Sequence, residues 1–163
     1  MSTKTTDPMV ARLRGDTAHG NIPFDVPFIT HVEGNLYIGG CEDGLVLPEF
    51  IQHVISLYPW ERYEVLHELR SFTEVRAYDD EPDEALFERL AEWAAGYVED
   101  GPTLIHCQAG LNRSGLLTAM VLIRQGRTVA EAVSLLREKR SPAVLCNRGF
   151  ERWLYEREQS KAA

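Results

Sequence analysis

A cysteine and an arginine stand six positions apart in the segment Leu104–Gly115, which reads LIHCQAGLNRSG. Apolar and β-branched residues precede Cys107, and an apolar stretch of helical composition follows Arg113. The pattern therefore predicts a loop between a strand and a helix, with the thiol at its start and the guanidinium at its end. Two interpretations are open: chemistry on a bound anion, or ordinary loop composition around a buried thiol.

The loop could bind an anion chiefly through its backbone. If the chain curls at the end of the strand, consecutive N–H groups point inward and form a nest, to which the dipole of the following helix adds. Gly110 allows a backbone conformation that other residues resist. Arg113 contributes a planar pair of donors that matches two phosphate oxygens. The expected phosphate-binding residues are Gln108, Ala109, Gly110, Leu111, Asn112 and Arg113.

The same positive surroundings would act on the sulfur of Cys107. The pKa of a free thiol is about 8.5, and beside a helix N-terminus and a cation it falls to roughly 3.5–7.5. Cys107 would then be a thiolate at neutral pH, placed to attack a phosphorus atom held by the loop. The neighbouring strand, glycine, serine and apolar helix together favour this nucleophilic site over a buried structural thiol.

The whole chain limits the kinds of partner. Its 163 residues are enough for one domain with a core. A net charge of −8 argues against the basic face of a nucleic-acid binder, although a local pocket can still attract an anion. No apolar run approaches the length of a membrane span, and the first twenty residues lack a secretory signal. We therefore expect no nucleic-acid partner, no membrane association and a cytoplasmic location.

Three cysteines, Cys41, Cys107 and Cys146, are an odd number at scattered spacing. This is neither a disulfide framework nor a metal-binding pattern, and the histidines show no ligand spacing either. We expect no metal and no cofactor. Cys41 and Cys146 are interpreted as reduced thiols; the alternative, that one of them forms a protective disulfide with Cys107, stays open.

Strands and helices alternate along the chain. Strands are expected over 35–40, 53–57, 73–78 and 103–107. The apolar residues of 63–72 have the spacing of a helix. Further helices are expected over 83–98, 114–124, 128–140 and 147–159. The alternation predicts an α/β fold with a central, mainly parallel sheet flanked by helices. Ligands of such folds bind beyond the carboxyl ends of the strands, which is where Cys107 lies.

The loop also carries a resemblance to a known family. HCQAGLNRSG is similar to the His-Cys-x5-Arg-Ser/Thr signature of protein tyrosine phosphatases, and more closely to the dual-specificity branch, whose loops often read His-Cys-x-x-Gly-x-x-Arg-Ser. HVEGNLYIGG and HVISL resemble the first two strands of that branch, and CNRGFERWL resembles its closing helix. The resemblance covers roughly residues 29–158. We therefore expect a polar, partly flexible N-terminal extension over 1–28 and a single catalytic domain of the dual-specificity fold over 29–160.

The resemblance implies metal-free, two-step hydrolysis of a phosphomonoester through a cysteinyl-phosphate, with Cys107 as the nucleophile. The family takes its general acid from a loop after the strand upstream of the signature, where this chain reads RAYDDEPDE. Asp79 comes first after that strand and is the preferred acid. Asp80 is the alternative, whereas Asp83 fits the start of a helix better.

Two residues beside the nucleophile receive supporting roles. Ser114 is expected to donate a hydrogen bond to the sulfur and so ease the departure of the thiolate, although it could be an ordinary serine of a first helical turn. The resemblance implies that His106 bonds the loop backbone, fixes the loop and lowers the thiol pKa. A buried histidine of purely structural role is the other interpretation of His106, and the two are compatible.

The expected function is thus a protein-tyrosine or dual-specificity type phosphatase, acting on a phosphorylated protein or a small phosphomonoester. One alternative is a same-fold phosphatase for a non-protein substrate, such as an RNA 5′-triphosphate, a nucleotide or a phosphoinositide. Another is a pseudophosphatase that binds phosphorylated partners without hydrolysis. Arg113 is the only cationic side chain of the loop, which favours one phosphate at a time. Tyrosine versus serine/threonine preference and the oligomeric state stay open.

Overall fold

The computed structural model of the protein describes residues 5–162. Its centre is a five-stranded sheet in the order β3-β4-β7-β5-β6. The strands are β3 (Ile29–Glu33), β4 (Leu36–Gly39), β5 (His53–Ser56), β6 (Ser71–Glu74) and β7 (Thr103–His106). Strand β3 pairs antiparallel with β4, whereas β4, β7, β5 and β6 are parallel to one another. The predicted α/β fold with a mainly parallel central sheet is confirmed.

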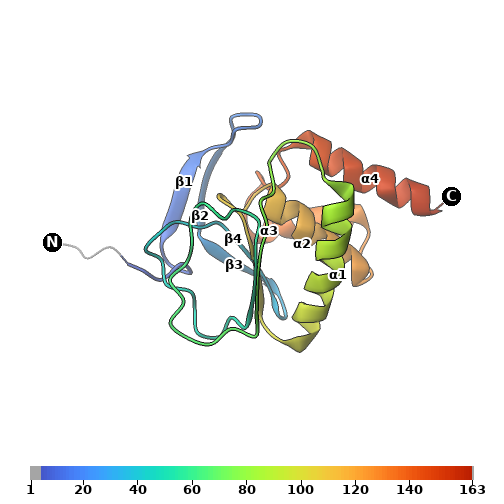
Figure 1. Ribbon diagram of the computed structural model, residues 1–163. Coiled ribbons are helices and arrows are strands. Elements are labelled where there is room, and N and C mark those ends of the chain that lie inside the picture. Colours follow the sequence, from blue (N-terminus) through green and yellow to red (C-terminus); the bar gives the residue numbers. More distant parts are fainter. Residues whose placement is uncertain (1–4, 163) are drawn as a thin grey trace.

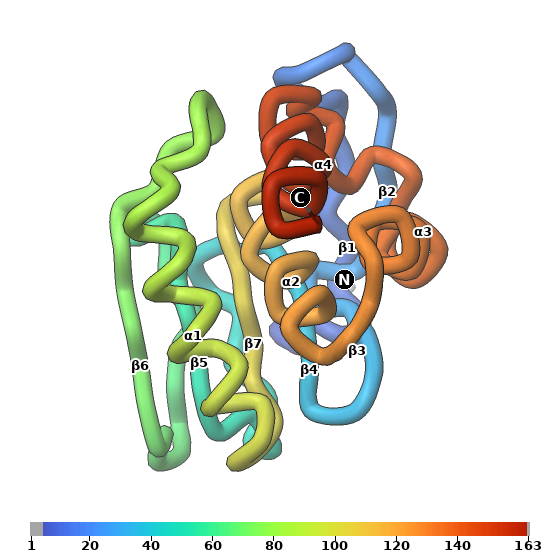
Figure 2. The backbone as a smooth tube through the Cα atoms, turned by 90° about the vertical axis from the view of Figure 1, so that its right-hand side faces the viewer, coloured from blue at the N-terminus to red at the C-terminus, as the bar shows by residue number. Residues whose placement is uncertain are grey.

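Four helices gather on one side of this sheet (Figures 1 and 2). They are α1 (Glu84–Asp100), α2 (Arg113–Arg124), α3 (Val129–Lys139) and α4 (Arg148–Ala162). The apolar helix α2 lies between α1 and α3 and contacts β4 and β7. Within residues 5–162, no helix combines the length and the apolar character needed to cross a membrane.

Capping residues set where two of the helices begin. The side chain of Asp83 accepts a hydrogen bond from the backbone N–H of Leu86 at 3.2 Å, which satisfies one free donor of the first turn of α1. Thr128 and Glu131 form the predicted capping box at the start of α3. Asp83 therefore serves as a helix cap, in agreement with its interpretation from the sequence.

The sheet is buried on both faces, as its near-continuous apolar strands require. Successive residues of a strand point to opposite faces. Val54 and Leu104 accordingly belong to one apolar cluster, and their neighbours Ile55 and Ile105 belong to the other, larger cluster under the helices. This burial makes the sheet a rigid platform for the loops at its edge.

Two segments differ from the expectation. Residues 63–72, whose spacing indicated a helix, contain no helix; the chain is irregular there until β6 begins. Strand β6 spans 71–74 instead of the predicted 73–78. The backbone of this segment is held by the sheet edge, where Arg70 N–H donates to the Gln52 carbonyl at 2.8 Å. Pairing with β5 thus outweighs a local helical preference.

The N-terminal region contains a hairpin that the sequence pattern did not indicate. Strand β1 (Arg12–Asp16) pairs antiparallel with β2 (Pro23–Pro27), and the two form a separate ribbon beside the main sheet (Figure 1). Its base is attached to the domain, because the Gly40 N–H donates to the Phe28 carbonyl at 2.8 Å. Of the extension expected over 1–28, residues 1–4 lie outside the described residues.

Candidate active site

Four loops meet at one edge of the sheet because the four parallel strands end there. Gly39 of β4 and Ser56 of β5 both lie beside His106, the last residue of β7, and Ser56 also lies beside Glu74 of β6. The loops that follow these strands therefore lie next to one another. The loop after β7 begins with Cys107, so the cysteine stands at the centre of this edge.

The loop from Cys107 to Arg113 turns its carbonyl groups outward. The carbonyl of Gln108 accepts from the N–H of Cys41 at 3.0 Å, and that of Leu111 accepts from Leu145 at 3.0 Å. Two more carbonyls, those of Ala109 and Gly110, accept from the guanidinium of Arg140. The scaffold thus satisfies the acceptors of the loop.

The N–H groups of the same peptides have the opposite arrangement. In residues 5–162, no protein acceptor receives the backbone N–H of Gln108, Ala109, Leu111 or Asn112. The N–H of Gly110 points at the Cys107 sulfur, at 3.3 Å. Unpaired backbone donors are uncommon, and a row of them beside a helix N-terminus is an anion-binding nest. The backbone geometry therefore agrees with the phosphate loop expected from the sequence.

Glycines allow the loop to lie directly against the sheet. Gly110 has φ +74°, and a Cβ there would stand 2.5 Å from the Gly39 carbonyl carbon and 2.6 Å from Nη2 of Arg140. A Cβ on Gly40 would stand 2.5 Å from the Gln108 carbonyl oxygen. A larger residue at either position would push the loop away from its support.

Arg140, just after α3, supports the loop from behind and was not singled out by the sequence. Its Nε donates to the Gly110 carbonyl at 2.8 Å and its Nη2 to Ala109 at 2.9 Å. Its Nη1 donates to the Pro27 carbonyl and the Thr30 hydroxyl, both at 2.8 Å. Burial lowers the pKa of Arg140 to about 10, which leaves it charged at neutral pH. All three nitrogens are used in holding structure, so Arg140 is a scaffold cation.

The sulfur of Cys107 lies in a strongly polar environment although it is buried. Its Sγ lies 3.2 Å from the Ser114 hydroxyl oxygen and 3.3 Å from the Gly110 nitrogen. Burial alone would raise the pKa of Cys107. The charge of Arg113 and the hydrogen bonds from Ser114 and Gly110 outweigh burial, so the pKa of Cys107 lies below its ordinary value. The structure thus brings together the thiol, the serine and the loop amides as expected.

His106 is buried beneath the loop. Its Nδ1 donates to the Cys107 carbonyl at 3.3 Å, and its ring meets that of Tyr63 edge-on at 5.3 Å. Burial lowers the pKa of His106 to about 4, so the ring is neutral at neutral pH. The hydroxyl of Tyr63 donates to the Gly40 carbonyl. His106 therefore touches the loop backbone, and its neutral state suits a structural residue better than an acid or a base.

Arg113 presents a nitrogen that no group within residues 5–162 uses. Its Nη1 donates to the Ala77 carbonyl at 3.1 Å, and its guanidinium lies over the ring of Tyr58 at 5.3 Å. Its Nε is buried and has no hydrogen-bond partner within the described part of the chain. A buried guanidinium N–H without a partner is costly unless a ligand supplies the acceptor. This observation indicates an anion as the missing partner.

The two candidate acids occupy different environments. Asp79 is one of the cavity-lining residues, and its side chain is 25% exposed. Its Oδ2 accepts from Nδ2 of Asn112 at 3.0 Å, and its Oδ1 accepts from Nδ2 of Asn147 at 2.9 Å. Asp80 is exposed and contributes only its carbonyl, which accepts from Asn147 at 3.0 Å. The geometry therefore links Asp79, and not the Asp80 carboxyl group, to the phosphate loop.

The two remaining cysteines border the loop on different sides. Cys41 is buried behind it, and burial raises its pKa to about 12. Cys146 lies beside Asn112, with its Sγ 3.3 Å from Nδ2. All three cysteines are free thiols in this structure. No group of three or more His, Cys, Asp or Glu side chains within residues 5–162 could hold a metal ion.

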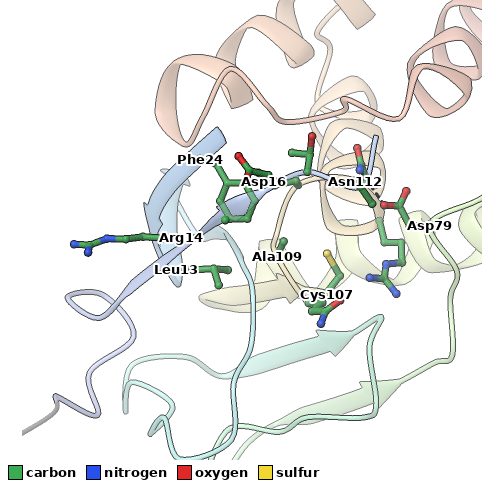
Figure 3. Close-up of a pocket in the computed structure, with 14 residues that line it drawn as sticks. Leu13, Arg14, Asp16, Phe24, Asp79, Cys107, Ala109 and Asn112 are labelled. Carbon is green, nitrogen blue, oxygen red and sulfur yellow. Dashed lines mark hydrogen bonds between the residues drawn. The ribbon is translucent and has the colours of Figure 1, made fainter. Parts of the chain in front are cut away.

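A cavity of about 340 Å³ lies in front of Cys107 (Figure 3). One half of its fourteen lining residues comes from the loops that follow β6 and β7, including Asp79 and Arg113. The other half comes from the hairpin β1–β2, including Leu13 and Phe24. Figure 3 shows the Arg14 side chain extending away from the cavity, where its Nε pairs with Asp25 at 3.1 Å. Arg113 is therefore the cation available to a ligand among these lining residues.

Comparisons with known proteins identify the family. The family model "Dual specificity phosphatase, catalytic domain" matches residues 51–160. The chain therefore belongs to the dual-specificity phosphatase family. No curated protein matches the chain in a sequence comparison.

Solved structures show the same fold. A mouse putative dual-specificity phosphatase complexed with zinc tungstate is 22% identical, with 82% of this chain and 88% of that chain covered and a TM-score of 0.70. The human tyrosine phosphatase-like serine/threonine/tyrosine-interacting protein is 21% identical, with 83% and 98% covered and a TM-score of 0.64. PTPMT1 in complex with PI(5)P is 16% identical, with 83% and 99% covered and a TM-score of 0.58.

The environment of Cys107 predicts its reactivity. Because the pKa of this thiol is lowered, alkylation by iodoacetamide should become half-maximal at a pH below that of a free cysteine. Ser114→Ala removes one hydrogen bond to the thiolate and should raise that midpoint by about one pH unit. Mass spectrometry of the peptide that contains Cys107 measures the rate, and Cys107→Ser is the control. A midpoint at or above that of free cysteine would contradict the proposed electrostatics.

Proposed function

We propose that this protein is a cysteine-dependent phosphomonoester hydrolase of the protein-tyrosine or dual-specificity type. The observation that carries the proposal is the convergence, at one cavity, of a thiol of lowered pKa with backbone N–H groups and an Arg113 Nε that are unpaired within residues 5–162. Together these groups would hold a phosphoryl group by its oxygens directly above a nucleophile.

In the first step, the thiolate of Cys107 attacks phosphorus, the S–P bond forms and the bond to the leaving oxygen breaks. The loop N–H groups and Arg113 stabilise the charge on the three non-bridging oxygens. Asp79, on the wall of the same cavity, gives its proton to the leaving oxygen. The products of this step are the dephosphorylated alcohol or phenol and a cysteinyl-phosphate.

In the second step, water attacks the cysteinyl-phosphate. The Asp79 carboxylate takes a proton from this water, the S–P bond breaks and inorganic phosphate leaves. The sulfur departs as a thiolate, which the Ser114 hydroxyl stabilises across the 3.2 Å contact. One carboxyl group thus acts first as an acid and then as a base, and each step restores the protonation state that the other requires.

The nucleophile can be tested directly. Cys107→Ser should lower turnover of p-nitrophenyl phosphate by at least about a thousandfold, because the serine hydroxyl is a far weaker nucleophile at neutral pH. Binding of a phosphate ester should persist, since the loop and Arg113 are unchanged. Vanadate should inhibit the wild-type protein and EDTA should not. Metal-dependent turnover that survives Cys107→Ser would reject the proposal, and absence of turnover between pH 5 and 7 would favour a pseudophosphatase.

The general acid is tested by the same substitution at two adjacent positions. Asp79→Asn should lower kcat/KM by about a hundredfold and remove the basic limb of the pH profile, because that limb reports loss of the acid's proton. Asp80→Asn is the matched control, and it should leave the profile unchanged because the Asp80 side chain is exposed. If Asp80→Asn removes the limb and Asp79→Asn does not, the assignment is reversed.

The charge of the cavity predicts a preference among substrates. Arg113 is its available cation, so a second phosphate group would have no partner there and would face a chain of net charge −8. We expect kcat/KM to be higher for phosphotyrosine peptides than for a phosphoinositide headgroup with several phosphates or an RNA 5′-triphosphate. Initial rates across these three substrate classes measure the preference. A tenfold or greater preference for either polyphosphate would instead support the non-protein alternative.

A further inference from the structure

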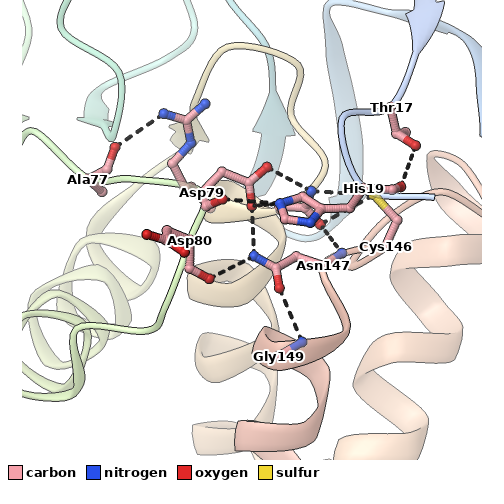
Figure 4. A network of polar contacts seen from close by, with 10 residues as sticks. Thr17, His19, Ala77, Asp79, Asp80, Cys146, Asn147 and Gly149 are labelled. Carbon is pink, nitrogen blue, oxygen red and sulfur yellow. Dashed lines mark hydrogen bonds and ion pairs between the residues drawn. The ribbon is translucent and has the colours of Figure 1, made fainter. Parts of the chain in front are cut away.

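The tip of the N-terminal hairpin contacts the proposed acid. Nε2 of His19 lies 3.1 Å from the backbone carbonyl oxygen of Asp79 and 3.3 Å from its Oδ1 (Figure 4). Sixty positions separate the two residues in the sequence. His19 also lies outside the region matched by the family model, which begins at residue 51. A segment beyond the matched region therefore reaches the centre of the active site.

The hairpin holds His19 in place through bonds of its own. The hydroxyl of Thr17 donates to the His19 carbonyl at 2.6 Å and accepts from the N–H of Ile22 at 2.8 Å. Gly20 and Asn21 adopt left-handed backbone conformations, with φ of 82° and 50°, and close the turn. The turn thus fixes the backbone of His19 beside Asp79, and the contacts with Asp79 orient its imidazole.

The base of the hairpin is tied to the phosphate loop. The carbonyl of Pro27, at the end of β2, accepts from Arg140, whose other nitrogens hold the carbonyls of Ala109 and Gly110. Phe24 of β2 packs against the main core. Hairpin and loop therefore share one support, and His19 keeps a defined position relative to Cys107.

The chemistry of the acid explains why a histidine suits this position. In residues 5–162, three side chains contact the Asp79 carboxyl group: Asn112, Asn147 and His19. The two asparagines approach with Nδ2, which only donates, and so they match an ionised carboxylate. A protonated carboxyl group has an O–H that needs an acceptor. In the observed contact Nε2 faces the Asp79 carbonyl oxygen, so it carries the proton and donates to that oxygen and toward Oδ1 of the ionised form. In the other neutral tautomer Nε2 gives up the bond to the carbonyl and can accept the O–H of the protonated form.

We propose that His19 is a positioning residue for Asp79, which holds this carboxyl group in place in both of its protonation states. The inference rests on the proposed function, because that reaction uses Asp79 first as an acid and then as a base. The hairpin would thus contribute to acid–base chemistry as well as forming one wall of the cavity.

The test uses two aryl phosphates that differ in how much they need an acid. Phenyl phosphate has a poor leaving group, whereas p-nitrophenyl phosphate has a good one that departs without much protonation. His19→Ala should lower kcat/KM for phenyl phosphate about tenfold and for p-nitrophenyl phosphate less than about threefold. Inhibition by vanadate should be unchanged, since the phosphate loop is intact. His19→Gln should restore most of the loss, because an amide can donate or accept from a similar position.

Two further measurements separate positioning from a structural effect. His31→Ala is the matched control. Nε2 of His31 also contacts a backbone carbonyl, that of Gly34 at 2.8 Å, but this contact lies at the turn between β3 and β4. His31→Ala should therefore change the rate with neither substrate. In an Asp79→Asn background, His19→Ala should have no additional effect. Equal losses on both substrates, or a full loss in the Asp79→Asn background, would overturn the inference.

The proposed function and this inference can fail separately. Wild-type turnover that is lost on Cys107→Ser, together with wild-type behaviour of His19→Ala, would overturn the inference and leave the proposed function standing. A wild-type protein that hydrolyses neither aryl phosphate would overturn both.

Discussion

One constraint governs the arrangement around the site: the peptide groups between Cys107 and Arg113 hold their carbonyls outward and their N–H groups inward. Bringing several backbone N–H groups together on one side of a loop is unfavourable by itself, because the crowded N–H groups lose hydrogen bonds to water. The arrangement persists because the carbonyls on the other side are paired with Cys41, Leu145 and the buried Arg140. The scaffold satisfies the acceptors and thereby leaves the donors to a ligand. The Arg113 charge and the hydrogen bonds from Ser114 and Gly110 lower the pKa of the Cys107 thiol.

This constraint explains the placement of elements that are distant in the sequence. Gly40, directly after β4, has no side chain, so the loop can lie against the backbone there, and Gly110 of the loop lies against the Gly39 backbone in the same way. The apolar helix α2 begins at Arg113 and directs its N-terminus at the loop. Asn112 extends the network outward, because its amide reaches Asp79 while its Oδ1 accepts from the Asn147 backbone at 2.9 Å. Nucleophile, anion site and proposed acid thus form one connected structure.

The features that follow from local pattern could be predicted from the sequence. The strand–loop–helix around Cys107, the capping box at Thr128 and the place of Asp79 after an upstream strand all involve neighbouring residues. Residues 63–72 were mispredicted, because a helical spacing was outweighed by the edge of the sheet. The hairpin was missed because β2 begins and ends with proline and alternates poorly. His19 contacts a residue 60 positions away, and Arg140 contacts one 30 positions away. Such contacts leave no local pattern in the sequence from which they could be predicted.

The position of Arg140 in the sequence also affects the order in which the site is completed during synthesis. Synthesis runs from the N-terminus, so a nascent chain contains Cys107 and the whole phosphate loop well before it contains residue 140. Until that guanidinium is in place, the carbonyls of Ala109 and Gly110 lack their partner, and the carbonyl of Pro27 lacks its link to them. The reactive thiol is therefore made early, but its surroundings are completed late. Competence to handle a phosphate thus arises only after residue 140 has been made, and a product that stops before it would carry the signature without the site.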